Sequence, residues 1–264
     1  MLKWIKNTLN SIWNNNQDLN STSDFNLAQE ELPQHIAVIM DGNGRWAQKK
    51  DLVRTKGHQK GVENLKNLVK LSNKLGIKYL TAYAFSTENW KRPEKEVDFL
   101  MDLFKRVFRQ EVDNFKEENI KVNVIGYKDR LPQEVSEKAE KLMHKTKDNT
   151  GLELNIALDY GGQAEIVEST KQIINDVQSG DLNVDDITKE EFAKYLYTAG
   201  QEEVDLLIRP GGEKRISNFL LWQSAYAELY FTTTYWPDFN EDEFKEALQE
   251  YQNRNRRFGG TKGK

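Results

Sequence analysis

The 264-residue chain has no cysteine and only three histidines and five prolines. Without cysteine, disulfides, thiolate metal sites and cysteine nucleophiles are excluded. The longest apolar runs are far shorter than a membrane-spanning helix, and no secretory signal with a cleavage site follows Lys3 and Lys6. These absences are compatible with a reducing compartment, and we expect a cytoplasmic protein.

The chain also lacks the basic excess that is typical of nucleic-acid-binding proteins. Its formal net charge is −4, so we expect no nucleic-acid partner. Charged residues make up 30% of the chain, hydrophobic residues 38% and aromatic residues 11%. This balance predicts a globular protein with a solvated surface and an aromatic-rich core.

Residues 1–32 differ from the rest, because their second half is polar and rich in asparagine. We interpret them as a leader, and residues 33–264 as one domain. The start of the leader has apolar residues that share one helical face, flanked by lysines, which favours a flexible segment or a short amphipathic helix. Such a helix predicts weak, peripheral association with the inner face of a membrane. The alternatives are a floppy tail and a helix packed on the protein's own surface. The face consists of Leu2, Ile5, Leu9, Ile12 and Trp13.

Short apolar runs alternate with longer amphipathic ones across residues 33–264. The runs Ile36–Met40, Tyr79–Phe85, Val122–Ile125, Leu152–Leu158 and Val204–Ile208 predict buried strands. Helical spacing predicts helices at about 57–75, 96–118, 133–147 and 162–178. The alternation predicts the α/β class, a single domain with a mostly parallel open β-sheet flanked by helices. In such sheets, ligands bind at the carboxyl ends of the strands.

Polar segments follow four of the expected strands at that end: residues 41–46, 86–93, 159–162 and 209–215. They bring arginines to or just beyond the strand ends, although the chain as a whole is acidic. Several fixed cations at one edge suit the binding of two diphosphate groups. The arginines are Arg45, Arg54, Arg92, Arg209 and Arg215.

The first polar segment allows two interpretations. Gly42 and Gly44 permit close approach of backbone N–H groups to an anion, and Asp41 could hold Mg²⁺. Alternatively, the segment is an ordinary glycine-rich turn in which Asp41 caps the next helix. The spacing matches neither a P-loop nor a dinucleotide-binding motif. Further on, Arg54 and His58 share one face if their segment is helical, and the glycines beside His58 suggest a helix start near a ligand.

The second polar segment contains a tryptophan next to two basic residues. Trp90 precedes Lys91 and Arg92, which is unusual for a solvent-exposed loop. One interpretation is a mobile loop that closes over a ligand, with Trp90 excluding water. The other is a surface loop whose tryptophan is tucked into the core.

Several long motifs resemble the cis-prenyltransferases of the undecaprenyl diphosphate synthase type. They are His35–Ala47, Gly57-His58, Tyr83–Pro93, Asp205–Arg209 with Gly212–Glu228, and Arg256–Gly260. The match runs in order over about 33–260. The resemblance implies a Mg²⁺-dependent enzyme that elongates an allylic diphosphate such as farnesyl diphosphate with isopentenyl diphosphate. It also implies a homodimer and a long product, with undecaprenyl diphosphate, a lipid carrier for cell-wall synthesis, favoured.

The resemblance assigns roles to matched residues. Asp41 handles the allylic diphosphate and Mg²⁺, with Glu228 as a second metal ligand, and Asn89 takes part in proton abstraction. Gly42, Asn43, Gly44, Arg45, Arg54 and His58 line the allylic diphosphate site. Arg209, Arg215 and Ser217 hold isopentenyl diphosphate, and Ser86, Trp90 and Arg92 belong to a closing loop. Trp46, Thr87, Glu88 and Ile216, within the same motifs, are further substrate-binding candidates.

The chain departs from the family pattern at Pro210, Asp159 and Gln163, where threonine, asparagine and arginine are usual. All three lie near the expected site, so we expect effects on affinity rather than loss of activity. The alternative function is a non-catalytic partner subunit on the same fold, which the presence of Asp41 and the arginines disfavours. A nucleotide- or sugar-phosphate-binding enzyme is disfavoured by the missing nucleotide motif.

The fourth strand offers candidates for the floor of a product tunnel. Leu152, Leu154 and Ile156 alternate along it and so share one face. Simple core packing is the competing interpretation.

Overall fold

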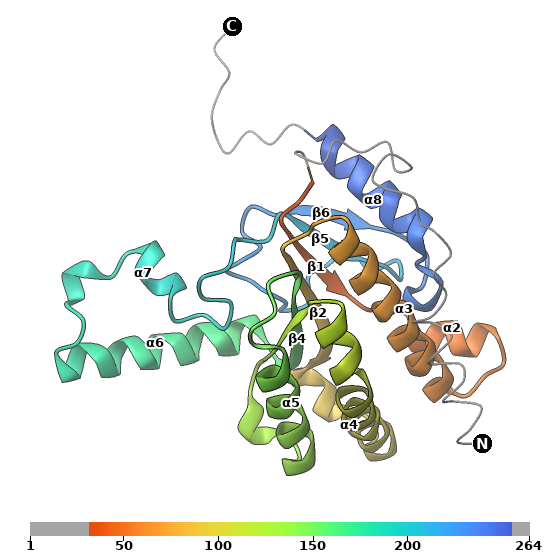
Figure 1. The fold of residues 1–264 in the computed structure, drawn as a ribbon, viewed down its shortest axis with the longest axis horizontal. Coiled ribbons are helices and arrows are strands. Elements are labelled where there is room, and N and C mark those ends of the chain that lie inside the picture. Colours follow the sequence, from red (N-terminus) through yellow and green to blue (C-terminus); the bar gives the residue numbers. More distant parts are fainter. Residues whose placement is uncertain (1–31, 255–264) are drawn as a thin grey trace, which may run out of the picture.

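The computed structural model describes residues 32–254, so residues 1–31 of the leader and the motif at 256–260 lie outside the described residues. One six-stranded sheet organises the chain, in the order β3-β4-β2-β1-β5-β6, and every neighbouring pair is parallel (Figure 1). The predicted α/β fold is confirmed. The strands are β1 His35–Ile39, β2 Tyr79–Ser86, β3 Lys121–Ile125, β4 Glu153–Tyr160, β5 Leu206–Arg209 and β6 Glu228–Phe231.

All five predicted strands and all four predicted helices correspond to elements of the structure. The α-helices are α2 Asn43–Lys49, α3 Arg54–Lys74, α4 Glu94–Glu117, α5 Gln133–Thr146, α6 Gly162–Ser179, α7 Lys189–Ala193 and α8 Glu241–Asn253. Short 3₁₀ helices are η3 Thr87–Lys91, η4 Lys128–Arg130, η5 Val184–Asp186 and η6 Trp236–Asp238. Helices α2, α7 and α8 and strand β6 were not predicted. Strand β6 has only four residues, two of them intermediate and one exposed, so it lacks the apolar run of a central strand.

The two faces of the sheet carry different cores. A large apolar cluster packs helices α3, α4, α5 and α8 on one face, where residues such as Val38, Leu80 and Ile156 point. A smaller cluster on the other face includes Tyr83 and Phe219, beside helix α6. The alternation of side chains along each strand produces this division. No helix within residues 32–254 has the length and apolar character needed to cross a membrane.

Strand β1 is the point where the sheet order reverses. Strand β2 lies on one side of β1 and β5 on the other, although both follow it in the chain. The segments that leave the carboxyl ends of β1 and β5 therefore border one crevice, the usual ligand position in open α/β sheets. Asp41 follows β1 and Arg209 ends β5, so the topology places them together.

Candidate active site

The carboxylate of Asp41 lies between two arginines. Arg209 Nη2 donates to Asp41 Oδ2 at 2.9 Å, and Arg45 Nη2 lies 3.0 Å from Asp41 Oδ1. The backbone N–H of Gly42 also donates to Oδ1, at 2.6 Å. Burial alone would raise the pKa of Asp41, but these donors outweigh it and hold the pKa below its usual value. Asp41 is therefore ionised at neutral pH, and its side chain is still 29% exposed and accessible to a ligand.

Arg209 connects the Asp41 carboxylate to the segment that follows β5. Its Nη1 donates to Ser217 Oγ at 2.6 Å and to the backbone carbonyl of Arg215. Ser217, Asn218 and Leu220 all adopt left-handed backbone angles, with φ of 49°, 62° and 44°. Consecutive non-glycine residues rarely hold such angles unless the surrounding contacts impose them. The buried Arg209 guanidinium is one of those contacts, and it aims the Ser217 hydroxyl into the site.

Three cationic or titratable side chains converge on Glu96, near the start of α4. The carboxylate oxygen Oε1 lies 3.3 Å from Arg54 Nε, 3.4 Å from His58 Nε2 and 3.0 Å from Arg92 Nη1. Burial is the main cause that lowers the pKa of His58, partly offset by the charge of Glu96. Arg54 and His58 do lie one turn apart on α3, as predicted. Sequence reasoning missed Glu96, which lies outside the polar strand ends.

The glycines beside His58 serve packing. The helix α3 begins at Arg54, close to the cavity as expected, but Gly57 and Gly61 lie inside the helix rather than at its start. A Cβ on Gly57 would come within 2.0 Å of the Asn43 carbonyl oxygen, and one on Gly61 within 2.3 Å of Asn43 Oδ1. Helices α2 and α3 can therefore approach closely, which brings Arg45 and Arg54 to one site.

The segment after β2 is a short helix with a reciprocal cap. Ser86 N donates to Asn89 Oδ1 at 3.2 Å, and the Ser86 side chain accepts from the Asn89 backbone. Trp90 packs against Phe85 with ring centroids 5.1 Å apart and donates from Nε1 to Asp159 Oδ1 at 2.8 Å. In this conformation the Trp90 indole therefore anchors the segment to β4 and the core.

Asp159, one of the departures from the family pattern, is fully buried behind this segment. Its Oδ2 lies 3.1 Å from Arg130 Nε, and its own side chain is 0% exposed. Burial raises its pKa, partly offset by the Trp90 hydrogen bond and the Arg130 charge. Its φ of 47° is one that aspartate and asparagine tolerate better than most residues. Asp159 thus supports Trp90 from beneath and does not face the ligand space.

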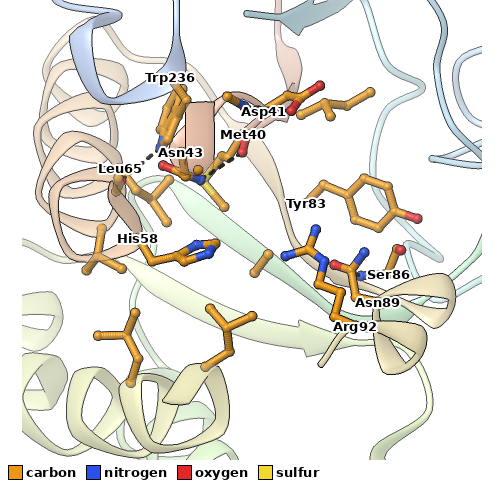
Figure 2. A pocket seen from close by; sticks show the side chains of 18 of the residues that line it. Met40, Asp41, Asn43, His58, Leu65, Tyr83, Ser86, Asn89, Arg92 and Trp236 are labelled. Carbon is orange, nitrogen blue, oxygen red and sulfur yellow. Dashed lines mark hydrogen bonds between the residues drawn. The ribbon is translucent and has the colours of Figure 1, made fainter. Parts of the chain in front are cut away.

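A cavity of about 920 Å³ joins these groups to an apolar interior. Figure 2 shows its polar side chains, including Asp41, His58, Asn89 and Arg92, around one open space. The opposite part lies between helices α3 and α4 and strands β2 and β4. That part is lined by Val62, Leu65, Ala84, Leu100, Leu103, Phe104, Val107, Phe108 and Ile156.

Most of the predicted site residues line this cavity. They are Asp41, Gly42, Asn43, Gly44, Arg45, Arg54, His58, Ser86, Glu88, Asn89, Arg92, Arg209, Arg215 and Ser217. Trp46, Thr87, Trp90 and Ile216 are not in its wall. Of the three tunnel-floor candidates, Ile156 lines the cavity, whereas Leu152 and Leu154 are buried core residues. Additional lining residues that the motifs did not single out include Tyr83 and Asn218.

Glu228 lies away from Asp41. It opens β6 and pairs with Leu206, whose β1 neighbour is Ile36, five residues before Asp41. At about 3.3 Å per residue, the backbones of the two residues are offset by roughly 16 Å along the strand direction. Arg254 Nη1 pairs with Glu228 Oε2 at 2.9 Å. A shared metal site of Asp41 and Glu228 within one chain is not supported, because the carboxylates lie at opposite ends of parallel strands.

Several buried polar atoms of the cavity have no hydrogen-bond partner among residues 32–254. They are Asn43 Oδ1, His58 Nε2 and Arg209 Nε. Unpaired buried polar groups are rare in folded proteins, and they often mark the place of a ligand or water. Arg209 Nε is an unpaired donor, and together with the exposed guanidinium groups of Arg54 and Arg215 it indicates an anion site, whereas Asn43 Oδ1 is an acceptor and would need a donor.

This combination, an arginine-rich end that opens into an apolar interior, suits an amphiphilic ligand with an anionic head and a hydrocarbon tail. The chain belongs to the undecaprenyl diphosphate synthase family, because the family model described as "Putative undecaprenyl diphosphate synthase" matches residues 39–259. The isoprenyl transferase of Clostridium perfringens is 52% identical over 236 residues, which cover 89% of this chain and 93% of the relative. That of Bacillus subtilis is 47% identical over 264 residues, covering 98% of this chain and 100% of the relative.

Solved structures agree with the family. Lavandulyl diphosphate synthase from Lavandula x intermedia, in complex with dimethylallyl diphosphate, superposes with a TM-score of 0.85 at 38% identity, over 87% of this chain and 99% of that one. A probable undecaprenyl diphosphate synthase from Campylobacter jejuni gives 0.72 at 36% identity, over 86% and 98%. The predicted family and enzyme class are confirmed: the chain is a prenyltransferase, and its family supports prenyl chain elongation. The non-catalytic alternative is not supported.

Proposed function

We propose that the enzyme condenses isopentenyl diphosphate repeatedly onto an allylic diphosphate such as farnesyl diphosphate and creates a cis double bond at each step. The observation that carries this proposal is the continuity of the cavity, whose arginine-rich end opens directly into an apolar space between α3 and α4. A diphosphate group would occupy the polar end of the cavity, and the growing hydrocarbon chain would occupy its apolar part.

The allylic diphosphate is assigned to the group around α2 and the start of α3. Arg45 and Arg54 supply positive charge, and Asn43 and His58 line the same part of the cavity. The hydrocarbon tail then extends along Val62 and the other apolar lining residues, where its burial stabilises the complex. Gly42 and Gly44 allow α2 to lie close to this anion.

Isopentenyl diphosphate is assigned to Arg209, Arg215 and Ser217. Arg209 is 5% exposed and already ordered by Asp41, whereas the Arg215 side chain is 61% exposed, pairs with Glu213 at the surface and would exchange that partner for the anion. The Ser217 hydroxyl, held by Arg209, can donate to a phosphate oxygen. The site is thus largely organised before the substrate arrives.

The reaction needs no nucleophilic side chain. The allylic C–O bond breaks and its electron pair leaves with the diphosphate, while the alkene carbon of isopentenyl diphosphate bonds to the allylic carbon. Loss of a proton from the neighbouring carbon forms the new double bond. The arginines stabilise the charge that develops on the departing diphosphate. The amide of Asn89 is too weak a base to accept this proton. We therefore assign proton acceptance to the released diphosphate, which is more basic, and assign to Asn89 the positioning of the C–H bond that loses the proton.

Mg²⁺ fits Asp41, because a single ionised carboxylate beside a diphosphate is a common Mg²⁺ arrangement. Bound there, Mg²⁺ would neutralise diphosphate charge and assist departure of the leaving group. Asp41 is already held by Arg209 and Arg45, which would fix the direction of its free lone pairs.

Residues 86–92 are assigned to closure over the substrates. Ser86, Glu88 and Arg92 line the cavity, while Thr87 and Trp90 do not, and Trp90 instead packs on Phe85 and donates to Asp159. Trp46 and Ile216 lie outside the cavity wall, so no substrate contact is assigned to them. The proposed product is a long-chain polyprenyl diphosphate, favouring undecaprenyl diphosphate as a carrier for cell-wall synthesis, made by a cytoplasmic homodimer that associates weakly with the membrane.

The test is incubation of the pure protein with farnesyl diphosphate, labelled isopentenyl diphosphate and Mg²⁺, followed by separation of products by chain length. A ladder of products that ends near eleven isoprene units supports the proposal. Absence of any labelled prenyl product in a folded preparation would contradict it. Omission of Mg²⁺ and addition of EDTA test the metal requirement in the same assay.

A further inference from the structure

The apolar part of the cavity ends near a buried ion pair. Lys66 of α3 contacts Glu111 of α4, and their side chains are only 5% and 2% exposed. Asn114 Nδ2 donates to the other Glu111 oxygen at 2.8 Å. Both charges are therefore paired, within the large apolar cluster that packs α3 and α4.

The position of the pair relative to the cavity is set by helix geometry. Lys66 follows Val62 by four residues on α3, and Glu111 follows Val107 by four residues on α4. Residues four apart lie above one another on the same helical face. Because Val62 and Val107 line the cavity, the ion pair bridges the two helices one turn farther from the arginine-rich end.

Stability alone does not account for an ion pair at this depth. Apolar residues of similar volume often stabilise a core at least as well as a buried ion pair, because both charges lose their hydration. Parting an existing pair is unfavourable, since each charge is then buried without a partner. A hydrocarbon chain that grows toward the pair must part it or turn aside, and the gain from burying one more isoprene unit is comparable to that penalty.

We infer that the Lys66–Glu111 pair closes the far end of the cavity and limits the length of the hydrocarbon chain that the enzyme accommodates. The inference rests on the proposed function for the nature of the chain. The limit on the length of hydrocarbon chain that binds can be measured without turnover.

The first experiment measures binding of prenyl monophosphates of 10, 15, 20 and more carbons by calorimetry. With the wild-type protein, affinity should rise with length and then stop rising. In the double variant Lys66→Met/Glu111→Met, which keeps volume but removes both charges, the rise should continue for at least one further isoprene unit. At the first length where the wild type shows no gain, we expect at least about threefold tighter binding by the variant.

Lys60→Ala/Glu63→Ala is the matched control, because it removes an exposed pair on the same helix, with Lys60 Nζ 3.0 Å from Glu63 Oε2. It should keep the wild-type length profile. Lys66→Ala/Glu111→Ala is the second charge-free variant and should also extend the profile, so the test does not depend on one variant folding. If a charge-free variant folds cooperatively but shows the same dependence of affinity on chain length as the wild type, the inference is wrong.

The second experiment compares product ladders from farnesyl diphosphate and isopentenyl diphosphate. Longer products from the charge-free variants, with the first condensation within about threefold of wild type, support the inference. Failure of every protein, wild type included, to elongate would count against the proposed function, and the binding profile would still decide the role of the pair.

Discussion

Arg209 donates a 2.9 Å hydrogen bond to Asp41 across 168 residues of sequence, from the end of β5 to the end of β1. These strands are neighbours in the sheet because the connection order reverses at β1. The pair therefore links the two halves of the site: α2 and α3 on the side of Asp41, and residues 215–218 on the side of Arg209. Each residue orders the other, and both line the cavity.

Asp41→Asn should lower turnover by roughly 10²- to 10³-fold, because it removes the charge that would hold Mg²⁺ and order both arginines. Folding should change little, since the amide can still accept one arginine hydrogen bond and the side chain is partly exposed. Single-turnover kinetics and thermal unfolding of the same preparation separate the two effects. Near-normal turnover would remove Asp41 from the mechanism.

Arg209→Lys should raise the Michaelis constant for isopentenyl diphosphate by about tenfold, since lysine cannot donate to Asp41 and Ser217 in the same geometry. It should also lower the unfolding free energy by about 1–3 kcal/mol, because Arg209 is buried. Arg215→Lys, at an exposed position, is the matched control for stability and should affect binding alone.

Arg54→Ala should instead weaken the allylic substrate. Kinetics in which each substrate is varied in turn test this division. If the Arg54 and Arg209 variants raise the same Michaelis constant, the assignment of two separate diphosphate sites is wrong.

The sheet and the carboxyl-end site could be predicted because their signals are local. Buried parallel strands give continuous apolar runs, and the rule for open α/β sheets then locates the ligand. Glu96 and the Lys66–Glu111 pair could not be predicted in the same way. They look like ordinary charged residues of amphipathic helices, and only the packing of α3 on α4 shows that they are buried. Likewise, Glu228 lies in a matched motif, but it is the first residue of β6 and so lies at the amino end of the sheet, opposite the site. This position could not be predicted because strand β6 was not predicted.

Glu96→Gln should lower the pKa of His58 further, because the charge of Glu96 raises that pKa against the effect of burial. With three histidines in the chain, imidazole NMR titration can follow each one. The signal of His35, whose pKa is shifted by other groups, is the internal control and should not move. An unchanged or raised pKa of His58 would show that Glu96 does not act on it electrostatically.

Asp159→Asn should stabilise the protein by roughly 1 kcal/mol at pH 7, since asparagine can still accept from Trp90 without a buried charge. The sign follows from the raised pKa of Asp159. Above the ordinary aspartate pKa, the unfolded state ionises more readily than the native state, so ionisation destabilises the fold. Urea unfolding at pH 7 and at pH 4 tests this, and the advantage of the variant should shrink at pH 4. An equal advantage at both values would exclude the buried charge as its cause.

His35 should make the enzyme less stable as the pH falls below about 6.5. Its ring is fully buried, and burial is the main cause of its lowered pKa, partly offset by the Glu202 carbonyl and nearby carboxylates. Nδ1 lies 2.7 Å from that carbonyl oxygen and Nε2 lies 2.8 Å from Thr81 Oγ1. The neutral ring satisfies both contacts by donating from Nδ1 and accepting the Thr81 hydroxyl at Nε2.

Protonation would remove the acceptor for Thr81 and place a charge in the core. Between the ordinary imidazole pKa and the lowered native value, the unfolded state binds more protons, so the unfolding free energy falls with decreasing pH, by up to about 1.4 kcal/mol per pH unit for this group. Urea unfolding from pH 8 to pH 5 measures the slope. His35→Gln should be less stable at pH 8, through lost packing, but its slope below pH 6.5 should be flatter than that of the wild type. His144→Gln, at an exposed position, should keep the wild-type slope. If His35→Gln keeps it too, another group, such as His58, accounts for the acid sensitivity.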